Sequence, residues 1–179
     1  MKIFSVAVDR HISLRALVPG DAEDLYRVVQ ANRQASQWLP WIGEAKGPAP
    51  DYLAQNSLVP APGRRTTLGI FCDNLLVGQI EFDPQDESAA PGVGSLGYFL
   101  DKNYSGKGIV TRACSAVLDY AFQEMKLIAM EIHCRPGNLP SIKVAKRLGF
   151  DGGEPDARID GQLLFIMTSG DWKALRAQS

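Results

Sequence analysis

The sequence has few cysteines, few histidines and almost no net charge. Its three cysteines, Cys72, Cys114 and Cys134, lie far apart and form no CxxC pair, which indicates reduced, buried thiols rather than disulfides. The only histidines are His11 and His133, and no metal-ligand spacing is present, so we expect no metal site. A net charge of −1 argues against a protein that holds nucleic acid through bulk positive charge, and we expect no nucleic-acid partner.

Long apolar runs and a secretion signal are also missing. No stretch approaches the roughly 20 apolar residues of a membrane span, and Asp9 and Arg10 follow the short apolar start too closely for a signal peptide. We therefore predict a cytoplasmic protein without membrane association. The 179 residues are 45% hydrophobic, which is enough for one compact domain, and we expect a single domain over residues 1–179.

Hydrophobic periodicity predicts strands and helices in alternation. We expect strands over residues 12–18, 66–72, 75–82, 94–100, 127–135 and 162–167, and helices from Asp21, over 51–58, after 108 and over 141–148. The helix after residue 108 carries one broad apolar stripe formed by Val110, Cys114, Val117, Leu118, Ala121 and Phe122. This order predicts an α/β fold whose mixed, mostly antiparallel sheet is flanked by helices.

The strand over 127–135 has strict alternation. Met130, Ile132 and Cys134 fall on one face, and Glu131 and His133 on the other. We expect the first face to be buried and His133 to be exposed, without a role.

A glycine-rich turn is the most informative local feature. Residues 104–110 read Tyr-Ser-Gly-Lys-Gly-Ile-Val, between a predicted strand and a predicted helix. Such a turn leaves backbone N–H groups at the positive end of the helix dipole, which is suited to a phosphate anion. The alternative is a surface loop that uses glycine for positive φ. The G-x-G-x-x-G pattern over 92–97 precedes a strand and opens no helix, so we do not expect a Rossmann site.

Four motifs in order resemble the GCN5-related N-acetyltransferase (GNAT) superfamily, and most closely its ribosomal-protein (Rim) group. They are the Gly-Tyr-Phe-Leu of 97–100, the turn over 104–109, Asn138 with Ser141, and the Arg-Leu-Gly-Phe of 147–150. The resemblance covers nearly the whole chain. It implies a sheet that splits between the fourth and fifth strands, and transfer of an acetyl group from acetyl-CoA to a primary amine. Ser105 and Val110 depart from the family's usual turn.

The resemblance also implies which residues bind acetyl-CoA. The pyrophosphate would lie against Gly106, Lys107, Gly108, Ile109 and Val110. The backbone of Phe99, Leu100 and Asp101 would pair with the pantetheine arm, as an added strand does. Asn138 would hydrogen-bond the pantetheine, and Ser141 would lie near the sulfur.

Candidate catalytic residues are few. Many relatives have a tyrosine acid where this chain has Ala145, and Ser141 is the substitute that the Rim group suggests. The alternative is that Ser141 is a helix N-cap or first-turn hydroxyl. For the base we consider Glu81, whose alternative is an outward, solvated carboxylate. Three further acids lie beyond the Gly-Phe, where the Rim group has a glutamate, but they do not align with it: Glu154, Asp156 and Asp160. A water chain with no single base is a further possibility.

Trp38 and Trp41 would wall the acceptor site, or simply pack on the sheet edge. The expected acceptor is the N-terminal α-amine of a protein or peptide, because an α-amine with a pKa of about 7.7–8 requires less help from a base than a lysine with a pKa of about 10.4. The alternatives are a small amine (a polyamine, amino acid or antibiotic) and a non-catalytic CoA-binding regulatory domain. We expect a monomer or a homodimer.

Overall fold

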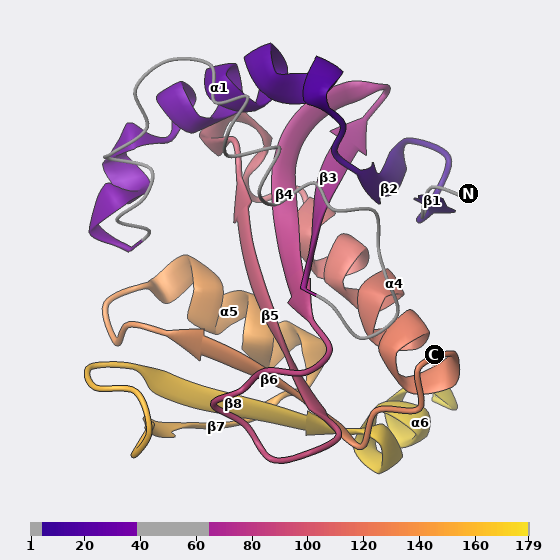
Figure 1. Cartoon of the computed structure of the whole chain (residues 1–179), viewed down its shortest axis with the longest axis vertical. Helices are drawn as coiled ribbons and strands as arrows, with labels where there is room; N and C mark the ends of the chain where they lie inside the picture. The colour runs from indigo at the N-terminus through magenta and orange to yellow at the C-terminus, as the bar shows by residue number, and fades with distance from the viewer. Residues whose placement is uncertain (1–4, 39–64, 179) are drawn as a thin grey trace.

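Eight strands form one mixed sheet in the computed structural model, which describes residues 5–38 and 65–178 (Figure 1). The strand order is β1-β2-β3-β4-β5-β6-β8-β7. Neighbouring strands run antiparallel except β5 and β6, which are parallel. The strands are β1 (Ser5–Ala7), β2 (Ile12–Ala16), β3 (Thr66–Cys72), β4 (Leu75–Asp83), β5 (Val93–Leu100), β6 (Ala129–Cys134), β7 (Asp151–Pro155) and β8 (Leu163–Thr168). The predicted α/β class with a mostly antiparallel sheet is confirmed.

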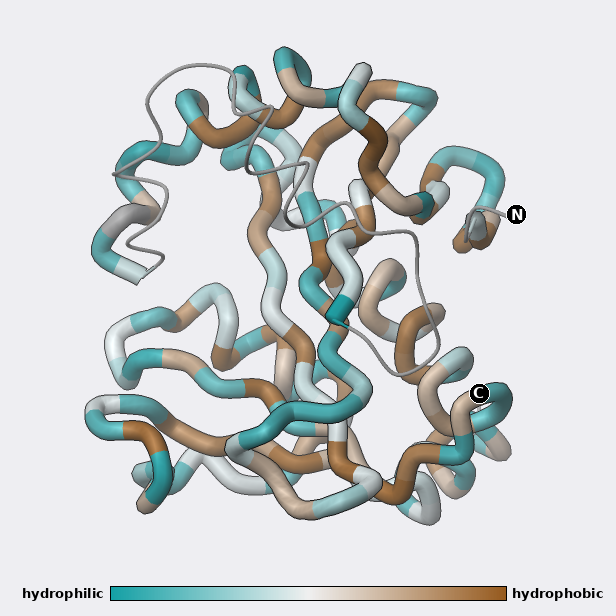
Figure 2. The backbone as a smooth tube through the Cα atoms, viewed as in Figure 1, coloured by the Kyte–Doolittle hydropathy of each residue, from teal (hydrophilic) through white to brown (hydrophobic). Residues whose placement is uncertain are grey.

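Helices cover both faces of this sheet. They are α1 (Ala22–Ala31), α4 (Ile109–Gln123), α5 (Leu139–Leu148) and α6 (Ser169–Arg176), with short 3-10 segments η1 (Pro19–Asp21), η2 (Arg33–Gln37) and η3 (Lys102–Tyr104). The larger core joins the sheet to α4, α5 and α6, and a smaller core lies under α1. In Figure 2 the hydrophobic stretches follow the strands and α4. Within the described ranges, none of the helices has the length and apolar character that crossing a bilayer requires.

The apolar stripe of α4 is buried as predicted, with one informative exception. Cys114, Val117, Leu118 and Ala121 are at most 1% exposed. Val110, in the first turn of the helix, is only half-buried and faces an open cleft. The helix is therefore held rigidly by its middle while its N-terminus stays accessible.

The sheet parts between β5 and β6. Their ladder ends at the pair Ser95 and Glu131, after which β5 runs on beside β4 and β6 beside β8. The two halves of the sheet then diverge, as Figure 1 shows. Gly94 lets the strands approach before the split, because a Cβ there would lie 2.7 Å from the Asp83 carbonyl oxygen and 3.0 Å from the Met130 sulfur. The predicted split is confirmed, and the middle glycine of the G-x-G-x-x-G pattern serves strand packing.

Some elements were not predicted individually. These are β1, β7 and α6. The sequence of β7, Asp-Gly-Gly-Glu-Pro, is poor in strand-forming residues, and it is an edge strand with an irregular register between Gly152 and Glu154. The helix expected over 51–58 lies outside the described residues.

The prediction that His133 is exposed is wrong. The His133 side chain is 13% exposed, with ring nitrogens 3.1 Å from Glu131 Oε2 and 2.9 Å from Asp156 Oδ2. Arg158 lies 2.8 Å from the same Glu131 oxygen and 3.1 Å from Asp156 Oδ1. The connection between β7 and β8 thus covers the second face of β6, and its opposite charges make burial of Glu131 and His133 possible. Periodicity within one strand could not predict this cover.

Candidate functional site

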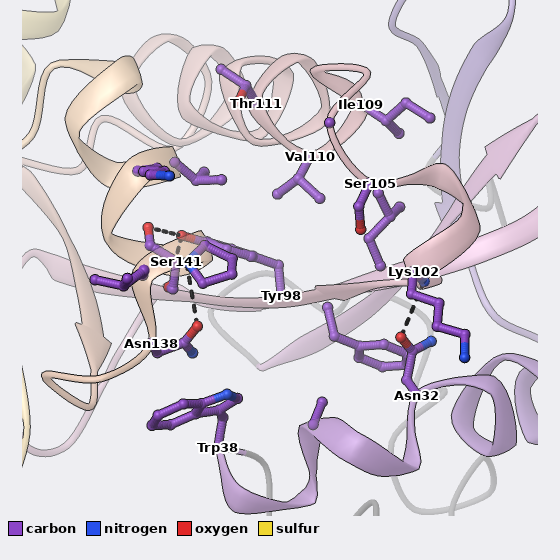
Figure 3. A pocket seen from close by; sticks show the side chains of 18 of the residues that line it. Asn32, Trp38, Tyr98, Lys102, Ser105, Ile109, Val110, Thr111, Asn138 and Ser141 are labelled. Atoms are coloured by element: carbon purple, nitrogen blue, oxygen red, sulfur yellow. Dashed lines mark hydrogen bonds between the residues drawn. The ribbon is translucent and has the colours of Figure 1, made fainter.

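A cleft of about 790 Å³ opens where β5 and β6 part (Figure 3). Its walls come from the end of β5, the glycine-rich turn, the first turns of α4 and α5, and η2 beside the end of α1. Of the residues predicted to bind acetyl-CoA or the acceptor, the cleft is lined by Trp38, Phe99, Leu100, Gly106, Gly108, Ile109, Val110, Asn138 and Ser141. The fold therefore gathers at one place residues as far apart in the chain as Trp38 and Ser141.

The glycine-rich turn ends in an open helix N-terminus. Gly106 has φ +78° and Gly108, the N-cap of α4, has φ +69°, both in the left-handed region that favours glycine. The N–H of Arg112 donates to the Gly108 carbonyl at 3.1 Å. Among the hydrogen bonds of the described residues, none uses the N–H groups of Ile109 to Thr111, as is usual for a first helical turn. These donors, together with the helix dipole, make this part of the cleft wall suited to an anion, and its contact with pyrophosphate stays a prediction.

Lys107 differs from its neighbours in the turn, because it does not line the cleft. Its ammonium lies 5.1 Å from the centre of the Tyr104 ring, and its carbonyl accepts a hydrogen bond from Arg112 Nη1 at 3.1 Å. Lys107 supports the turn from outside in this arrangement, and its contact with pyrophosphate stays a prediction. The two atypical turn residues, Ser105 and Val110, both line the cleft.

Asp101 is the strand-end residue that does not line the cleft. It is 3% exposed; its N–H donates to the Val77 carbonyl at 2.7 Å, and its carboxylate accepts from the Asn103 N–H at 2.9 Å. The backbone of Asp101, predicted to pair with the pantetheine arm, thus has its N–H already bonded within the protein. Of the three residues predicted to pair with pantetheine, Phe99 and Leu100 line the cleft.

The charge of the cleft is opposite in sign to that of the chain. Lys102, Lys143 and Arg147 line it, and among its described lining residues there is no aspartate or glutamate, whereas the whole chain carries −1. Such a lining favours a ligand with several negative charges. We did not single out these cations from the sequence. The available signal was the four-residue spacing of Lys143 and Arg147, which places both on one face of α5.

Ser141 lies at the inner end of the cleft, in the first turn of α5. Asn138 is the N-cap of that helix, and its Oδ1 accepts from the Ser141 N–H at 3.4 Å. Because Asn138 performs the capping, the Ser141 hydroxyl is not used for it. Instead, the Ser141 Oγ lies 3.1 Å from the Tyr98 hydroxyl (Figure 3). This geometry removes the N-cap part of the alternative for Ser141, whereas the first-turn position is what the structure shows, and the catalytic role stays a prediction.

Two titratable groups flank Ser141, the half-buried Tyr98 and the buried Cys134. Burial raises the pKa of the Tyr98 hydroxyl, against the lowering effect of its hydrogen bond with Ser141. Burial likewise raises the pKa of the Cys134 thiol, which also hydrogen-bonds Ser141. Both groups therefore stay protonated near neutral pH. Tyr98 belongs to the Gly-Tyr-Phe-Leu motif, but nothing in the sequence indicated its contact with Ser141.

Trp38 lines the cleft beside Asn138 (Figure 3). Its indole packs on the turn before α5, because a Cβ on Gly137 would lie 2.7 Å from the Trp38 Cη2 atom. Asn32 anchors the same region: its Oδ1 accepts from the Lys102 N–H at 3.2 Å and its Nδ2 donates to the Val28 carbonyl at 2.7 Å. Trp41 lies outside the described residues.

Glu81 is not among the residues that line the cleft. It lies on β4 opposite Gly97. Burial lowers the pKa of the Arg65 guanidinium, but the charge of Glu81 is among the effects that raise this pKa overall. Asp156 is held by His133 and Arg158. The structure therefore places no predicted carboxylate on the described lining of the cleft, and the base remains a hypothesis.

Comparison with known proteins gives concordant matches. The model of the family described as "Acetyltransferase (GNAT) domain" matches residues 11–151. YdaF of Bacillus subtilis (strain 168), whose name refers to ribosomal N-acetyltransferase activity, is 30% identical over 154 residues, with 83% of this chain and 82% of YdaF covered. The ribosomal-protein-serine acetyltransferase of Escherichia coli (strain K12) is 26% identical, with 82% of each chain covered.

A solved structure resembles the fold at lower identity. It is RimL, a ribosomal L7/L12 alpha-N-protein acetyltransferase in complex with coenzyme A, with a TM-score of 0.80 at 21% identity. The match covers 94% of this chain and 99% of RimL.

Proposed function

This chain belongs to the GNAT acetyltransferase family and is an acetyl-CoA-dependent N-acetyltransferase, and from this premise we propose that its acceptor is the N-terminal α-amine of a protein or peptide, of the ribosomal-protein type. The names of two relatives support this choice, since both refer to ribosomal N-acetylation or ribosomal-protein acetylation. We further propose that residues 1–179 act as one domain in the cytoplasm, as a monomer or homodimer.

The cleft suits acetyl-CoA in shape and in charge. The carrying observation is the open N-terminus of α4 on a cleft lined by three cations and, in its described part, by no carboxylate. Backbone groups of residues 106–110 would hold the pyrophosphate, and Lys102, Lys143 and Arg147 would provide further positive charge. Phe99, Leu100 and Asn138 would lie along the pantetheine arm. When bound, acetyl-CoA supplies an activated thioester as acetyl donor.

The lining of the cleft favours an acceptor that is easily deprotonated. Roughly a tenth of an α-amine is neutral near pH 7, against a far smaller fraction of a lysine amine. No described residue of the lining is a carboxylate base, so an acceptor that releases its proton to water fits better than one that requires a strong base. Glu81 acting through water stays the candidate base, and Trp38 and Trp41 the candidate acceptor wall.

Ser141 is our candidate for stabilising the leaving sulfur. Its hydroxyl would donate a hydrogen bond to the sulfur as the carbon–sulfur bond breaks and its electron pair passes to sulfur. The nitrogen gains the acetyl group and loses one proton, and the released thiol gains one, so the reaction balances without another reactant. Positioning of the two substrates in one cleft would supply much of the remaining acceleration.

The test is thiol release from acetyl-CoA with a matched panel of acceptors. Peptides with a free N-terminus are compared with the same peptides blocked at the N-terminus but containing lysine, and with polyamines, amino acids and aminoglycosides. We expect kcat/KM to be at least about 10-fold higher for free N-termini, given the difference in amine pKa. Preference for a small amine would overturn the acceptor proposal. Tight CoA binding without thiol release for any amine would instead indicate a regulatory domain.

A further inference from the structure

We propose that Tyr98 is a positioning residue for acetyl transfer, whose hydroxyl orients the hydroxyl of Ser141 toward the cleft. The inference deepens the proposed function and rests on the role given there to Ser141. It starts from a contact between residues 43 positions apart: the Tyr98 oxygen lies 3.1 Å from Ser141 Oγ and 3.2 Å from the Ser141 carbonyl oxygen.

The location of Tyr98 connects this contact with the cleft. Tyr98 lies on β5 beyond the Ser95–Glu131 pair, in the part of the strand that has left β6. Both Tyr98 and Ser141 line the cleft (Figure 3). The contact therefore joins the split strand to the first turn of α5 on the lining of the cleft.

The available protons favour one direction for this hydrogen bond. Each hydroxyl has one proton, so Tyr98 can donate either to the Ser141 carbonyl or to its Oγ. The carbonyl lies inside α5, where the N–H four residues further on is its regular donor. Ser141 Oγ, at 3.1 Å against 3.2 Å, is the nearer acceptor and has no regular backbone donor. Donation to it leaves the Ser141 proton free to point away from Tyr98.

Two directions remain for the Ser141 proton. One leads to the Cys134 sulfur, which stays a thiol because burial raises its pKa, and a thiol is a weak acceptor. The other leads into the cleft, where a sulfur that gains negative charge is the stronger acceptor. Since burial also raises the pKa of Tyr98, its hydroxyl stays a donor near neutral pH.

This arrangement makes the Ser141 hydroxyl a stronger hydrogen-bond donor, and both Tyr98 and Ser141 keep their protons. A hydroxyl that accepts a hydrogen bond becomes a better donor, because successive hydrogen bonds polarise one another. Tyr98 keeps its proton and Ser141 keeps its own, and the charge that develops on the leaving sulfur is stabilised by the Ser141 O–H group. Tyr98 acts through Ser141 and need not touch the substrate.

The test is a double-mutant cycle of Tyr98→Phe and Ser141→Ala, with turnover measured by thiol release and CoA affinity by calorimetry. Tyr98→Phe should lower kcat by about 3- to 10-fold, the value of one hydrogen bond, while the Kd of CoA changes by less than about 2-fold. In the Ser141→Ala background, Tyr98→Phe should have almost no further effect. Tyr26→Phe is the matched control, since Tyr26 is half-buried on α1 and does not line the cleft.

The outcomes separate the inference from the function that it deepens. Full turnover of Ser141→Ala would overturn the role of Ser141 and the inference together. A slow Ser141→Ala enzyme with a fully active Tyr98→Phe enzyme would overturn the inference alone. Effects that multiply in the double variant would also overturn it, because Tyr98 would then act independently of Ser141. An equal loss of kcat and CoA affinity in Tyr98→Phe would indicate a packing role instead.

Discussion

Replacement of Gly106 by alanine tests the anion site at the start of α4. Gly106 lines the cleft and has φ +78°. A Cβ built on it meets no heavy atom within 4 Å, so the substitution causes no clash inside the protein. Its consequences are backbone strain and a methyl group beside the open N–H groups of the helix.

The two consequences have different magnitudes. Left-handed backbone costs a residue other than glycine about 1–2 kcal/mol, which corresponds to a fall in Tm of roughly 2–8 °C for a chain of this size. Loss of one hydrogen bond to a charged phosphate costs about 1.5–3 kcal/mol. The Kd of CoA should therefore rise by about 10- to 150-fold.

Gly161→Ala is the matched control for strain. Gly161 has φ +70°, also with no heavy atom within 4 Å of a built Cβ, and does not line the cleft. Both variants should lose similar stability in thermal unfolding, whereas only Gly106→Ala should lose CoA affinity in calorimetry. Equal Kd values for the two variants would refute the assignment of the anion site. Unchanged stability of both would refute the strain argument.

A charged substitution at the same position separates electrostatics from shape. Asparagine and aspartate both tolerate left-handed backbone, so Gly106→Asn and Gly106→Asp differ mainly in charge. The Asp variant should bind CoA at least about 5-fold more weakly than the Asn variant, because its carboxylate would repel the pyrophosphate. This difference should shrink at high ionic strength. A difference that is independent of salt would contradict an electrostatic role.

Two further predictions concern the acceptor wall and the fold. Gly137→Ala should lower kcat/KM for the acceptor by about 10-fold without changing CoA affinity, because the new methyl would displace the Trp38 indole. The control is Gly20→Ala, whose new methyl would lie in open space. Normal acceptor kinetics of Gly137→Ala would contradict the role of Trp38 as a wall of the acceptor site. Asp21→Asn should lower the free energy of unfolding by about 1–3 kcal/mol near pH 7, because Asp21 accepts hydrogen bonds from Arg15 and the Val18 N–H. Burial raises the pKa of Asp21, but these donors outweigh burial and hold that pKa below its usual range. The stabilisation is therefore present above about pH 4 and is lost as the pH falls through the lowered pKa. Urea unfolding near pH 7 and pH 3, with the exposed Asp24→Asn as control, should show a smaller difference at the lower pH.

Much of the fold follows from local patterns. The strand predicted over 66–72 matches β3 (Thr66–Cys72), and the stripe from Cys114 to Phe122 is the buried face of α4. These segments have long, regular periodicity, which depends only on the residues within them. By contrast, β7 has two glycines in five residues and exists because β8 provides a partner strand.

The candidate site was only partly predictable. The turn glycines, Asn138 and Ser141 are found in motifs, and the cleft contains all of them. The positive lining was not visible, because Lys102, Lys143 and Arg147 come from two elements that meet only in the folded sheet. Asp101 shows the opposite case, since the resemblance implied that its backbone pairs with pantetheine, whereas the fold bonds its N–H to the Val77 carbonyl.

The sequence by itself determined the class of fold, the family resemblance and the turn that leaves the α4 N-terminus open, because each depends on a short run of neighbouring residues. Only the tertiary structure decided which distant residues contact the side chains of those segments. It buried His133 between Glu131 and Asp156, left the Ser141 hydroxyl free of capping and brought Tyr98 to it. Such contacts join residues far apart in the chain, and they depend on how the split sheet positions its helices rather than on any local pattern.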